Sequence, residues 1–314
     1  LAGSCWFLLA AVPRAQECVV ATQQKISETE GGFGGPLQAS DRFGRSIAVL
    51  GDLDGNGVTE LAVGAYEDDD GGTNQGAVWI LFLNADGTVA SAQKISETSG
   101  GFGGVLDSLD NFGTCVASLG DLDGNGITEL AVGALRDDDG GTEQGALWIL
   151  FLNADGTVAS EQKISETSGG FGGVLAAGDR FGASVVKLDD SGDGGVVLAV
   201  GADLDDDGGT DQGAVWIVSV KPDGTVSAQQ KVSALEGGFG GALDPEDYFG
   251  VAAGALGDLN GDGVVDLAVA AIGDDDGGSS QGAVWILLLN ANGTVASAQK
   301  ISATAGGFGG DLDP

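Results

Sequence analysis

The chain has 314 residues, and its 47 acidic against 12 basic residues give a formal net charge of −35 at pH 7. This charge opposes electrostatic binding to nucleic acids and anionic membrane surfaces, and the 42% hydrophobic content argues against a disordered chain. The chain has no histidine, and its three cysteines fit neither a disulfide framework nor a zinc site. Because divalent ions offset repulsion among carboxylates, the composition is a first indication of calcium.

The first 17 residues, "LAGSCWFLLAAVPRAQE", contain an apolar run of signal-peptide length without a preceding basic segment. We expect the remnant of a secretory signal. The alternative is a degenerate strand, because "GSCWFLL" aligns with "GAVWILF" from Gly76 to Phe82. Residues 18–40 are predicted to form an orphan outer strand, from Cys18 to Ser27, and a connector. No later segment is long enough to span a membrane, so we expect no membrane insertion of the mature chain.

The rest of the chain is an array of repeats. The motif "QK(I/V)S" recurs at spacings of 69, 69, 68 and 69 residues, with its lysine at Lys25, Lys94, Lys163, Lys231 and Lys300. Each complete unit carries, in order, "DxFG", an Asp-rich loop, "LAV(G/A)A", "DDDGG", "QGA(V/L)WI" and a "DG" or "NG" turn. A fixed period of this kind is the signature of a repeat architecture, so the units are interpreted as copies of one structural element.

Each unit is predicted to contain four strands. Its apolar residues come in short runs bounded by Gly, Asn and Asp, with no helical periodicity longer than a turn or two. In the first unit the strands are expected at residues 43–50, 60–65, 77–84 and 88–96. The Asp-Gly turn around Gly87 predicts a tight hairpin between the last two.

Four antiparallel strands in each repeated unit predict an all-β fold, a β-propeller built from four-stranded blades. The expected blades are residues 41–96, 110–165, 179–233 and 247–302, and residues 303–314 are expected to begin a further repeat. The chain has no methionine and stops at "GGFGGDLDP", in a segment that earlier leads into the next unit. We therefore expect a truncated chain that forms part of a larger ring.

The Asp-rich loop of the units has the ligand spacing of a calcium site. Oxygen-bearing side chains fall at positions 1, 3, 5 and 9, and position 7 offers its carbonyl, while calcium takes about six to eight oxygen ligands, some from water. The predicted ligands are Asp52, Asp54, Asn56, Val58 and Glu60 in the first unit, Asp121, Asp123, Asn125, Ile127 and Glu129 in the second, and Asp258, Asn260, Asp262, Val264 and Asp266 in the fourth.

The third unit departs from this pattern. Its loop is one residue shorter, and its best alignment places Asp189, Ser191, Asp193 and Gly195 at the first ligand positions but Val197 at position 9. We predict a weak or empty site there. The alternative for all four loops is a plain acidic turn in which glycine supplies the geometry.

These loops are not EF-hands. An EF-hand requires a bidentate glutamate at position 12 and a helix on each side. Position 12 here is a valine within a predicted strand, at Val63, Val132, Val200 and Val269. The last ligand comes instead from position 9, at the start of a strand, which makes this a strand-loop-strand site.

The stretch "DRFGRSIAVLGDLDGNGVTELAVGA" resembles an FG-GAP repeat, the blade of the integrin alpha-subunit propeller and of its bacterial relatives. Phe43-Gly44 and Gly64-Ala65 match the dipeptides that name the repeat, and the resemblance covers nearly all of residues 41–302. It implies a β-propeller whose Asp-rich loops bind calcium. Two features depart from the family: no proline follows Gly-Ala, and the integrin ring has seven blades. Nothing resembles the remaining integrin domains, so integrin-type adhesion is not implied.

Up-and-down strands place the Asp-rich loops and the "DG" turns on one face, and the "DDDGG" and "GGFGG" loops on the other. We favour solvated turns for "DDDGG" and gap-filling between blades for each phenylalanine; the alternative is a further cation site or an acidic ligand platform. Similarly, Cys115 and one tryptophan per unit are interpreted as core. The residues concerned are Asp68–Asp70, Asp137–Asp139, Asp205–Asp207, Asp274–Asp276, Phe33, Phe102, Phe171, Phe239, Trp79, Trp148, Trp216 and Trp285.

The expected function is a calcium-binding scaffold, extracellular and either secreted or on the cell surface, that binds a protein or carbohydrate on the "DDDGG" face. The alternative, implied by the resemblance, is the non-catalytic propeller of a secreted lyase or phospholipase whose catalytic part is missing. We predict no enzymatic activity of the chain itself, because its polar residues recur once per unit and form no acid–base pair or activated nucleophile.

Overall fold

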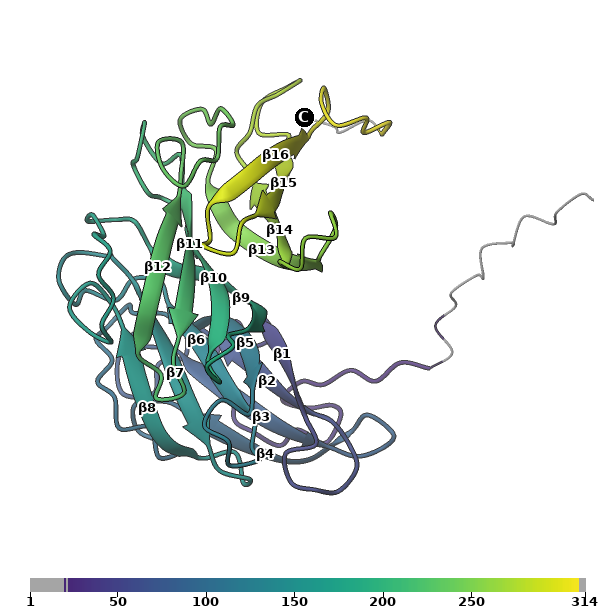
Figure 1. Ribbon diagram of the computed structural model, residues 1–314. Coiled ribbons are helices and arrows are strands. Elements are labelled where there is room, and N and C mark those ends of the chain that lie inside the picture. Colours follow the sequence, from purple (N-terminus) through teal and green to yellow (C-terminus); the bar gives the residue numbers. More distant parts are fainter. Residues whose placement is uncertain (1–19, 21, 311–314) are drawn as a thin grey trace, which may run out of the picture.

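The fold is all-β. A computed structural model of the chain describes residues 20 and 22–310, and in these it contains sixteen strands and no helix, hence none that could cross a membrane (Figure 1). The strands form four antiparallel four-stranded sheets, which we call blades 1 to 4. Blade 1 comprises β1 (Ile47–Gly51), β2 (Glu60–Ala65), β3 (Ala77–Leu83) and β4 (Val89–Ile95); blade 2, β5 (Phe112–Gly120), β6 (Glu129–Ala134), β7 (Ala146–Leu152) and β8 (Val158–Ile164); blade 3, β9 (Phe181–Asp190), β10 (Val196–Ala202), β11 (Ala214–Val220) and β12 (Val226–Val232); blade 4, β13 (Phe249–Gly257), β14 (Asp266–Ala271), β15 (Ala283–Leu289) and β16 (Val295–Ile301).

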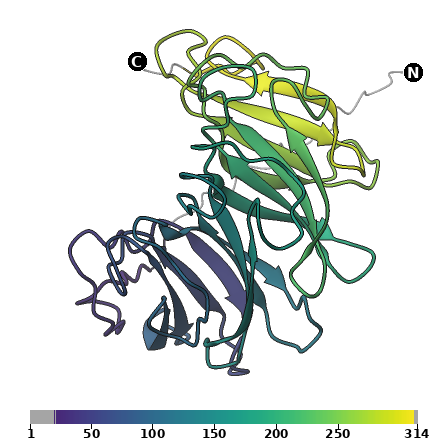
Figure 2. The ribbon, with the colours of Figure 1, turned by 90° about the vertical axis from the view of Figure 1, so that its left-hand side faces the viewer.

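The blades follow one another in chain order along an arc (Figures 1 and 2). The first strand of each blade contacts the first strand of the next, β1 with β5, β5 with β9 and β9 with β13. The fourth strand of each blade lies at the opposite edge of its sheet. This is the blade arrangement of a β-propeller, as the repeat pattern predicts.

The core lies between neighbouring blades. Separate clusters of buried apolar side chains join blade 1 to blade 2, blade 2 to blade 3, and blade 3 to blade 4. Strands β3 and β7 are therefore buried along nearly their whole length, because both faces of each sheet are covered. Continuous apolar runs such as "AVWILFL" in β3 are the sequence counterpart of this two-sided burial.

A phenylalanine from each of the first four "GGFGG" loops fills a gap in the blade that follows it, whereas Phe308 of the fifth is 44% exposed. The Phe102 ring lies 5.2 Å from the Phe112 ring and 4.9 Å from the Trp148 ring, measured between centroids. Equivalent triplets contain Phe33, Phe171 and Phe239, and the four "GGFGG" phenylalanines and their tryptophans are 3 to 7% exposed. The interpretation of these aromatic residues as core is confirmed.

Main-chain contacts fix the spacing between blades. Gly76 pairs with Phe112 of the next blade in an isolated parallel bridge, and a Cβ on Gly76 would lie 2.1 Å from the Phe112 carbonyl oxygen. Only glycine fits this approach. The Cys115 thiol donates to the Gly182 carbonyl of the next blade at 3.1 Å, and burial raises its pKa to about 12. Cys115 is thus a buried structural residue, as predicted.

The strand bounds agree with the predictions except at the first strand. Strand β1 begins at Ile47 instead of Phe43, because Gly44 adopts a φ of 92° in a turn. The orphan strand predicted from Cys18 to Ser27 stays a prediction, because it was expected to complete a blade other than blades 1 to 4. Residues 22–26 pair with no strand in the structure, and Ser27 makes an isolated bridge with Glu30. The predicted signal remnant, residues 1–17, lies outside the described residues.

Candidate metal centres

The Asp-rich loop of blade 1 connects β1 to β2 and ends on Glu60, the first residue of β2. Glu60 is fully buried, whereas Asp52 and Asp54 are exposed. One carboxylate oxygen from each of these three residues lies within 4.8 Å of the other two. The loop therefore brings together three of the predicted ligands at the point where the chain enters the core.

Local hydrogen bonds hold this loop in a conformation that gathers its oxygen atoms, as a metal-binding loop requires. The Gly57 amide donates to Asp52 Oδ2 at 2.9 Å, and the Asn56 amide donates to Asp54 Oδ1 at 3.0 Å. The Val58 amide donates to Asn56 Oδ1 at 2.7 Å. Such side-chain to main-chain bonds curve the loop so that its carboxylates lie on the same side.

The surroundings of Glu60 indicate that a cation fits this site. Its Oε2 accepts a hydrogen bond from the Leu53 amide at 2.7 Å, but its Oε1 is buried and has no hydrogen-bond partner among the described residues. Burial raises the pKa of Glu60 most, and the charges of Asp54 and Asp52 raise it further, while the nearby main-chain amides of Leu53 and Leu83 lower it. An unpaired buried carboxylate oxygen is costly, and a bound cation would supply the missing partner.

Blade 2 repeats this arrangement. Glu129 is fully buried, its Oε2 accepts from the Leu122 amide at 2.6 Å, and its Oε1 again has no partner among the described residues. Burial, and then Asp123 and Asp121, raise the pKa of Glu129 to about 7. The carboxylates of Asp121, Asp123 and Glu129 converge within 4.8 Å. The main-chain bonds within the loop, to Asp121, Asp123 and Asn125, match those of blade 1.

Blade 4 differs at position 9. Asp266 is one methylene shorter than glutamate, and both of its oxygens are occupied: Oδ2 accepts from the Leu259 amide at 2.9 Å, and Oδ1 accepts from the Leu289 amide at 3.0 Å. Asp258 accepts hydrogen bonds from main-chain amides within the loop. Within the described residues, three carboxylates converge only at the loops of blades 1 and 2.

The loop of blade 3 is a short hairpin. Strand β9 continues through Asp189 to Asp190, and Asp189 pairs with Val197 across the sheet. The Ser191 amide donates to the Gly195 carbonyl at 2.8 Å, and the Ser191 hydroxyl donates to Asp193. Here Asp189 lies in a strand and Val197 offers no carboxylate, so the residues predicted to form the weaker site are not brought together around one point.

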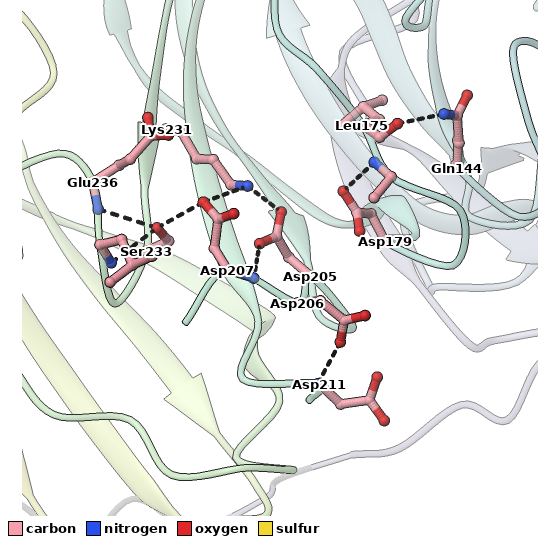
Figure 3. Close-up of polar contacts among 12 residues, drawn as sticks. Gln144, Leu175, Asp179, Asp205, Asp206, Asp207, Asp211, Lys231, Ser233 and Glu236 are labelled. Atoms are coloured by element: carbon pink, nitrogen blue, oxygen red, sulfur yellow. Dashed lines mark hydrogen bonds and ion pairs between the residues drawn. The ribbon is translucent and has the colours of Figure 1, made fainter. Parts of the chain in front are cut away.

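The opposite face holds a second set of acidic clusters, each containing a lysine of the chain. In blade 3, Lys231 Nζ lies 2.5 Å from Asp205 Oδ2 and 2.8 Å from Asp207 Oδ2, while Ser233 donates to Asp207 (Figure 3). The lysine ammonium also lies 5.6 Å from the centre of the Trp216 ring. The same pairs recur in the other blades, with Lys94 between Asp68 and Asp70, Lys163 between Asp137 and Asp139, and Lys300 between Asp274 and Asp276.

The interpretation of "DDDGG" as a solvated turn is therefore wrong for its first residue, whereas the third aspartate keeps a side chain that is 32 to 48% exposed while it pairs with the lysine. The first aspartate of each loop is 0 to 1% exposed, and the "QK(I/V)S" lysine neutralises it. The repeat pattern contains an indication of this pairing between the lysine and the aspartates, although no single motif shows it. The "QK(I/V)S" lysine and the aspartates each recur once per unit, 24 and 26 residues apart in blade 1.

The aspartate of each "DxFG" motif lies beside these clusters. Asp110 is 3% exposed, and its Oδ2 accepts from the Asp107 amide at 2.8 Å, which closes the turn into blade 2. Burial, and then the charge of Asp137, raise the pKa of Asp110 to about 7. Burial likewise raises the pKa of Asp247 to about 6.

The sequence comparisons match the repeats. The FG-GAP repeat family model matches residues 43–81, 112–150 and 249–287, which lie in blades 1, 2 and 4. Integrin alpha-4 of Xenopus laevis is 35% identical over 98 residues, 31% of this chain and 9% of that protein. Integrin alpha pat-2 of Caenorhabditis briggsae is 39% identical over 97 residues, covering 30% and 7%. Human integrin alpha-E is 32% identical over 148 residues, covering 42% and 12%.

The chain thus matches 7 to 12% of the length of these curated relatives. Among solved structures, a protein of unknown function from Bacteroides caccae aligns over 82% of this chain and 60% of its own. It is 13% identical with a TM-score of 0.35, so nothing is inferred from it.

Proposed function

Because the chain carries three FG-GAP repeats and resembles the integrin alpha propeller, we propose that it is a calcium-stabilised scaffold that binds a partner outside the cell. The observation that supports calcium is the convergence of three carboxylates in blades 1 and 2, each around a buried glutamate oxygen without a partner. Asp52, Asp54 and Glu60, and their counterparts in blade 2, would hold the ion, which would join the two strands that flank each loop.

The structure suggests a graded set of sites. Blades 1 and 2 would bind tightly, because their glutamates have an oxygen free for the ion. Blade 4 would bind more weakly, since a cation there competes with the two amides that already occupy Asp266. Blade 3 would not bind. The charge of −35 favours cation binding overall but does not distinguish among the loops.

Calorimetric titration with calcium tests this proposal. We expect two tight sites in the unaltered chain, one in each of the variants Glu60→Gln and Glu129→Gln, and none in the double variant. Glu28→Gln is the matched control, because Glu28 is exposed and lies outside the loops. Tight binding that persists in the double variant would refute the assignment of these glutamates as ligands.

For the partner, we propose a protein that docks on the "DDDGG" face. The acidic clusters there are neutralised internally, but Val105, Val174 and Leu235 in the connecting loops of that face are 68, 74 and 74% exposed. Solvent-exposed valine and leucine, on the same face as the exposed residues Asp138 and Asp206, suit a surface with apolar and basic residues. We propose no catalytic role, because the polar residues of each blade are used in repeated structural contacts.

A further inference from the structure

Blade 3 differs from the other blades at two neighbouring positions that face blade 4. Val197 and Ser219 are paired across β10 and β11. The next pair, Leu198 with Val218, corresponds to Leu61 with Leu81 in blade 1. The residues at the positions of Val197 and Ser219 are Glu60 and Phe82 in blade 1, Glu129 and Phe151 in blade 2, and Asp266 and Leu288 in blade 4. Blade 3 thus has two smaller side chains where blades 1 and 2 have a glutamate and a phenylalanine.

In blades 1 and 2 the phenylalanine fills the gap to the next blade. Phe82 is 6% exposed, and its Cε2 lies 3.2 Å from the Cβ position of Gly156, in the turn between β7 and β8. Phe151 is in the same relation to Gly224, also at 3.2 Å. The corresponding turn glycine of blade 4, Gly293, faces Ile217 and Gln230 instead, with no aromatic ring beneath it.

The missing ring leaves a cavity of about 260 Å³ between blades 3 and 4. One part of its wall is apolar, with Leu188, Val197, Ile217, Val264 and Leu289, and polar residues line the side toward solvent. An apolar cavity can bind a benzene ring, and this part of the wall offers an aromatic ring similar contacts.

The polar groups of the cavity are suited to a cation. Asp189 and Asp190 lie in its wall. Asp190 is paired with Lys187 at 2.5 Å, whereas Asp189 has no ion-pair partner among the described residues. The Ser219 hydroxyl also forms no hydrogen bond within the described part of the chain. With a net charge of −35, the protein attracts cationic ligands and repels anionic ones.

We propose that this interblade cavity binds a small aromatic amine, whose ring takes the place of the absent phenylalanine and whose ammonium group is held by Asp189 and the Ser219 hydroxyl. The site lies on the face of the Asp-rich loops, between the loop of blade 3, which is a closed hairpin, and Val264 in the loop of blade 4. It occurs at one interface of the three, so it gives the repetitive array a single asymmetric position at which recognition can take place.

Benzylamine is the probe, with benzyl alcohol as its neutral analogue, in calorimetric and ligand-observed NMR titrations of the whole chain in calcium buffer. We expect binding of benzylamine with a Kd of about 1 mM or tighter. Ser219→Phe restores the residue of blades 1 and 2, so it should weaken binding at least tenfold. Ser297→Phe is the matched control: it adds the same ring at an exposed position away from the cavity and should leave binding unchanged.

The variant Asp189→Asn distinguishes the contribution of the carboxylate charge to binding from that of the apolar wall. It should weaken benzylamine by roughly three- to tenfold and leave benzyl alcohol unchanged. Three results would overturn the proposal: no benzylamine binding at about 10 mM, equal binding to the chain and to folded Ser219→Phe, or equal loss of both probes in Asp189→Asn. If Ser219→Phe does not fold, the two probes on Asp189→Asn still decide the case.

Discussion

Each blade has acidic residues at both ends, and the two ends neutralise them differently. At the "DDDGG" end, a lysine from the fourth strand reaches between the first and third aspartates, as Lys163 does between Asp137 and Asp139. At the other end of blades 1 and 2, three carboxylates converge and no lysine or arginine ion pair joins them within the described residues. The comparison teaches that a run of aspartates does not by itself indicate a metal site; what matters is whether the chain supplies its own cation.

Chelation should affect one end alone, and this is the largest expected effect. If two sites each hold calcium at about 100 times its Kd, binding contributes about 5 kcal/mol in total, which is on the order of 10 °C in melting temperature. Thermal unfolding with calcium and with EDTA measures this difference. The variant Glu60→Gln/Glu129→Gln should melt at nearly the same temperature in both buffers; a full EDTA effect in that variant would contradict the assignment.

Replacing the lysine at the "DDDGG" end should destabilise that end of the blade whether or not calcium is present. Lys163→Met leaves Asp137, which is 1% exposed, as a buried charge without a partner, at a cost of about 3 kcal/mol in the free energy of unfolding. Urea unfolding measures it. Adding Asp137→Asn should recover part of the loss, because the uncompensated charge is then gone. An equal loss in the double variant would show that lysine packing, and not charge pairing, is responsible.

The carboxyl of Asp110 adds a pH dependence to the lysine-containing end. Its ordinary pKa is 3.8, and in the folded chain the pKa is raised to about 7. The protonated carboxyl therefore stabilises the fold fully below about pH 4, and this stabilisation is lost as the pH rises through 7. Asp110→Asn imitates the protonated form. At pH 8 it should be more stable than the unaltered chain by on the order of 2 kcal/mol, with only a small part of that difference left at pH 4.

Urea unfolding at pH 4 and pH 8 in the same calcium buffer tests this effect. The quantity that matters is the difference between the variant and the unaltered chain, since other carboxyls such as Asp247 titrate in the same range. A variant that keeps the full pH dependence would rule out Asp110 as its source.

The smallest effect is expected in blade 3. Asp193→Ala removes a predicted ligand from a loop that is already a closed hairpin, so calcium binding should not change and stability should change by about 0.5 kcal/mol or less. Calcium titration of this variant checks the result. A lost calcium site would show that the hairpin opens to bind the ion.

Much of the fold was predictable because the same strand pattern occurs in four successive repeats. Residues 60–65 were placed as a strand and β2 has these bounds, and the aromatic residues were correctly assigned to the core. The Asp-rich loops were located by ligand spacing alone. The spacing of the ligands does not show whether a carboxylate oxygen already has a hydrogen-bond partner. Asp266 and Glu60 occupy the same loop position, but the aspartate is shorter by one methylene. Both oxygens of Asp266 accept hydrogen bonds from main-chain amides, whereas Oε1 of Glu60 forms no hydrogen bond within the described residues.

Contacts between distant segments were harder to predict. The lysine of "QK(I/V)S" and the aspartates of "DDDGG" meet because β3 leads the chain away from the "DDDGG" end and β4 brings it back. Motif spacing alone does not show this return. The cavity beside Ser219 depends on what the next blade places against it.

Anomalous scattering from crystals grown with calcium, or soaked with a lanthanide in its place, tests the central claim most directly. The account predicts peaks in the loops of blades 1 and 2, in contact with Glu60 Oε1 and Glu129 Oε1, and none beside Val197 or between the lysines and aspartates of the opposite face. Strong peaks at the "DDDGG" loops, or none at the two glutamates, would contradict it.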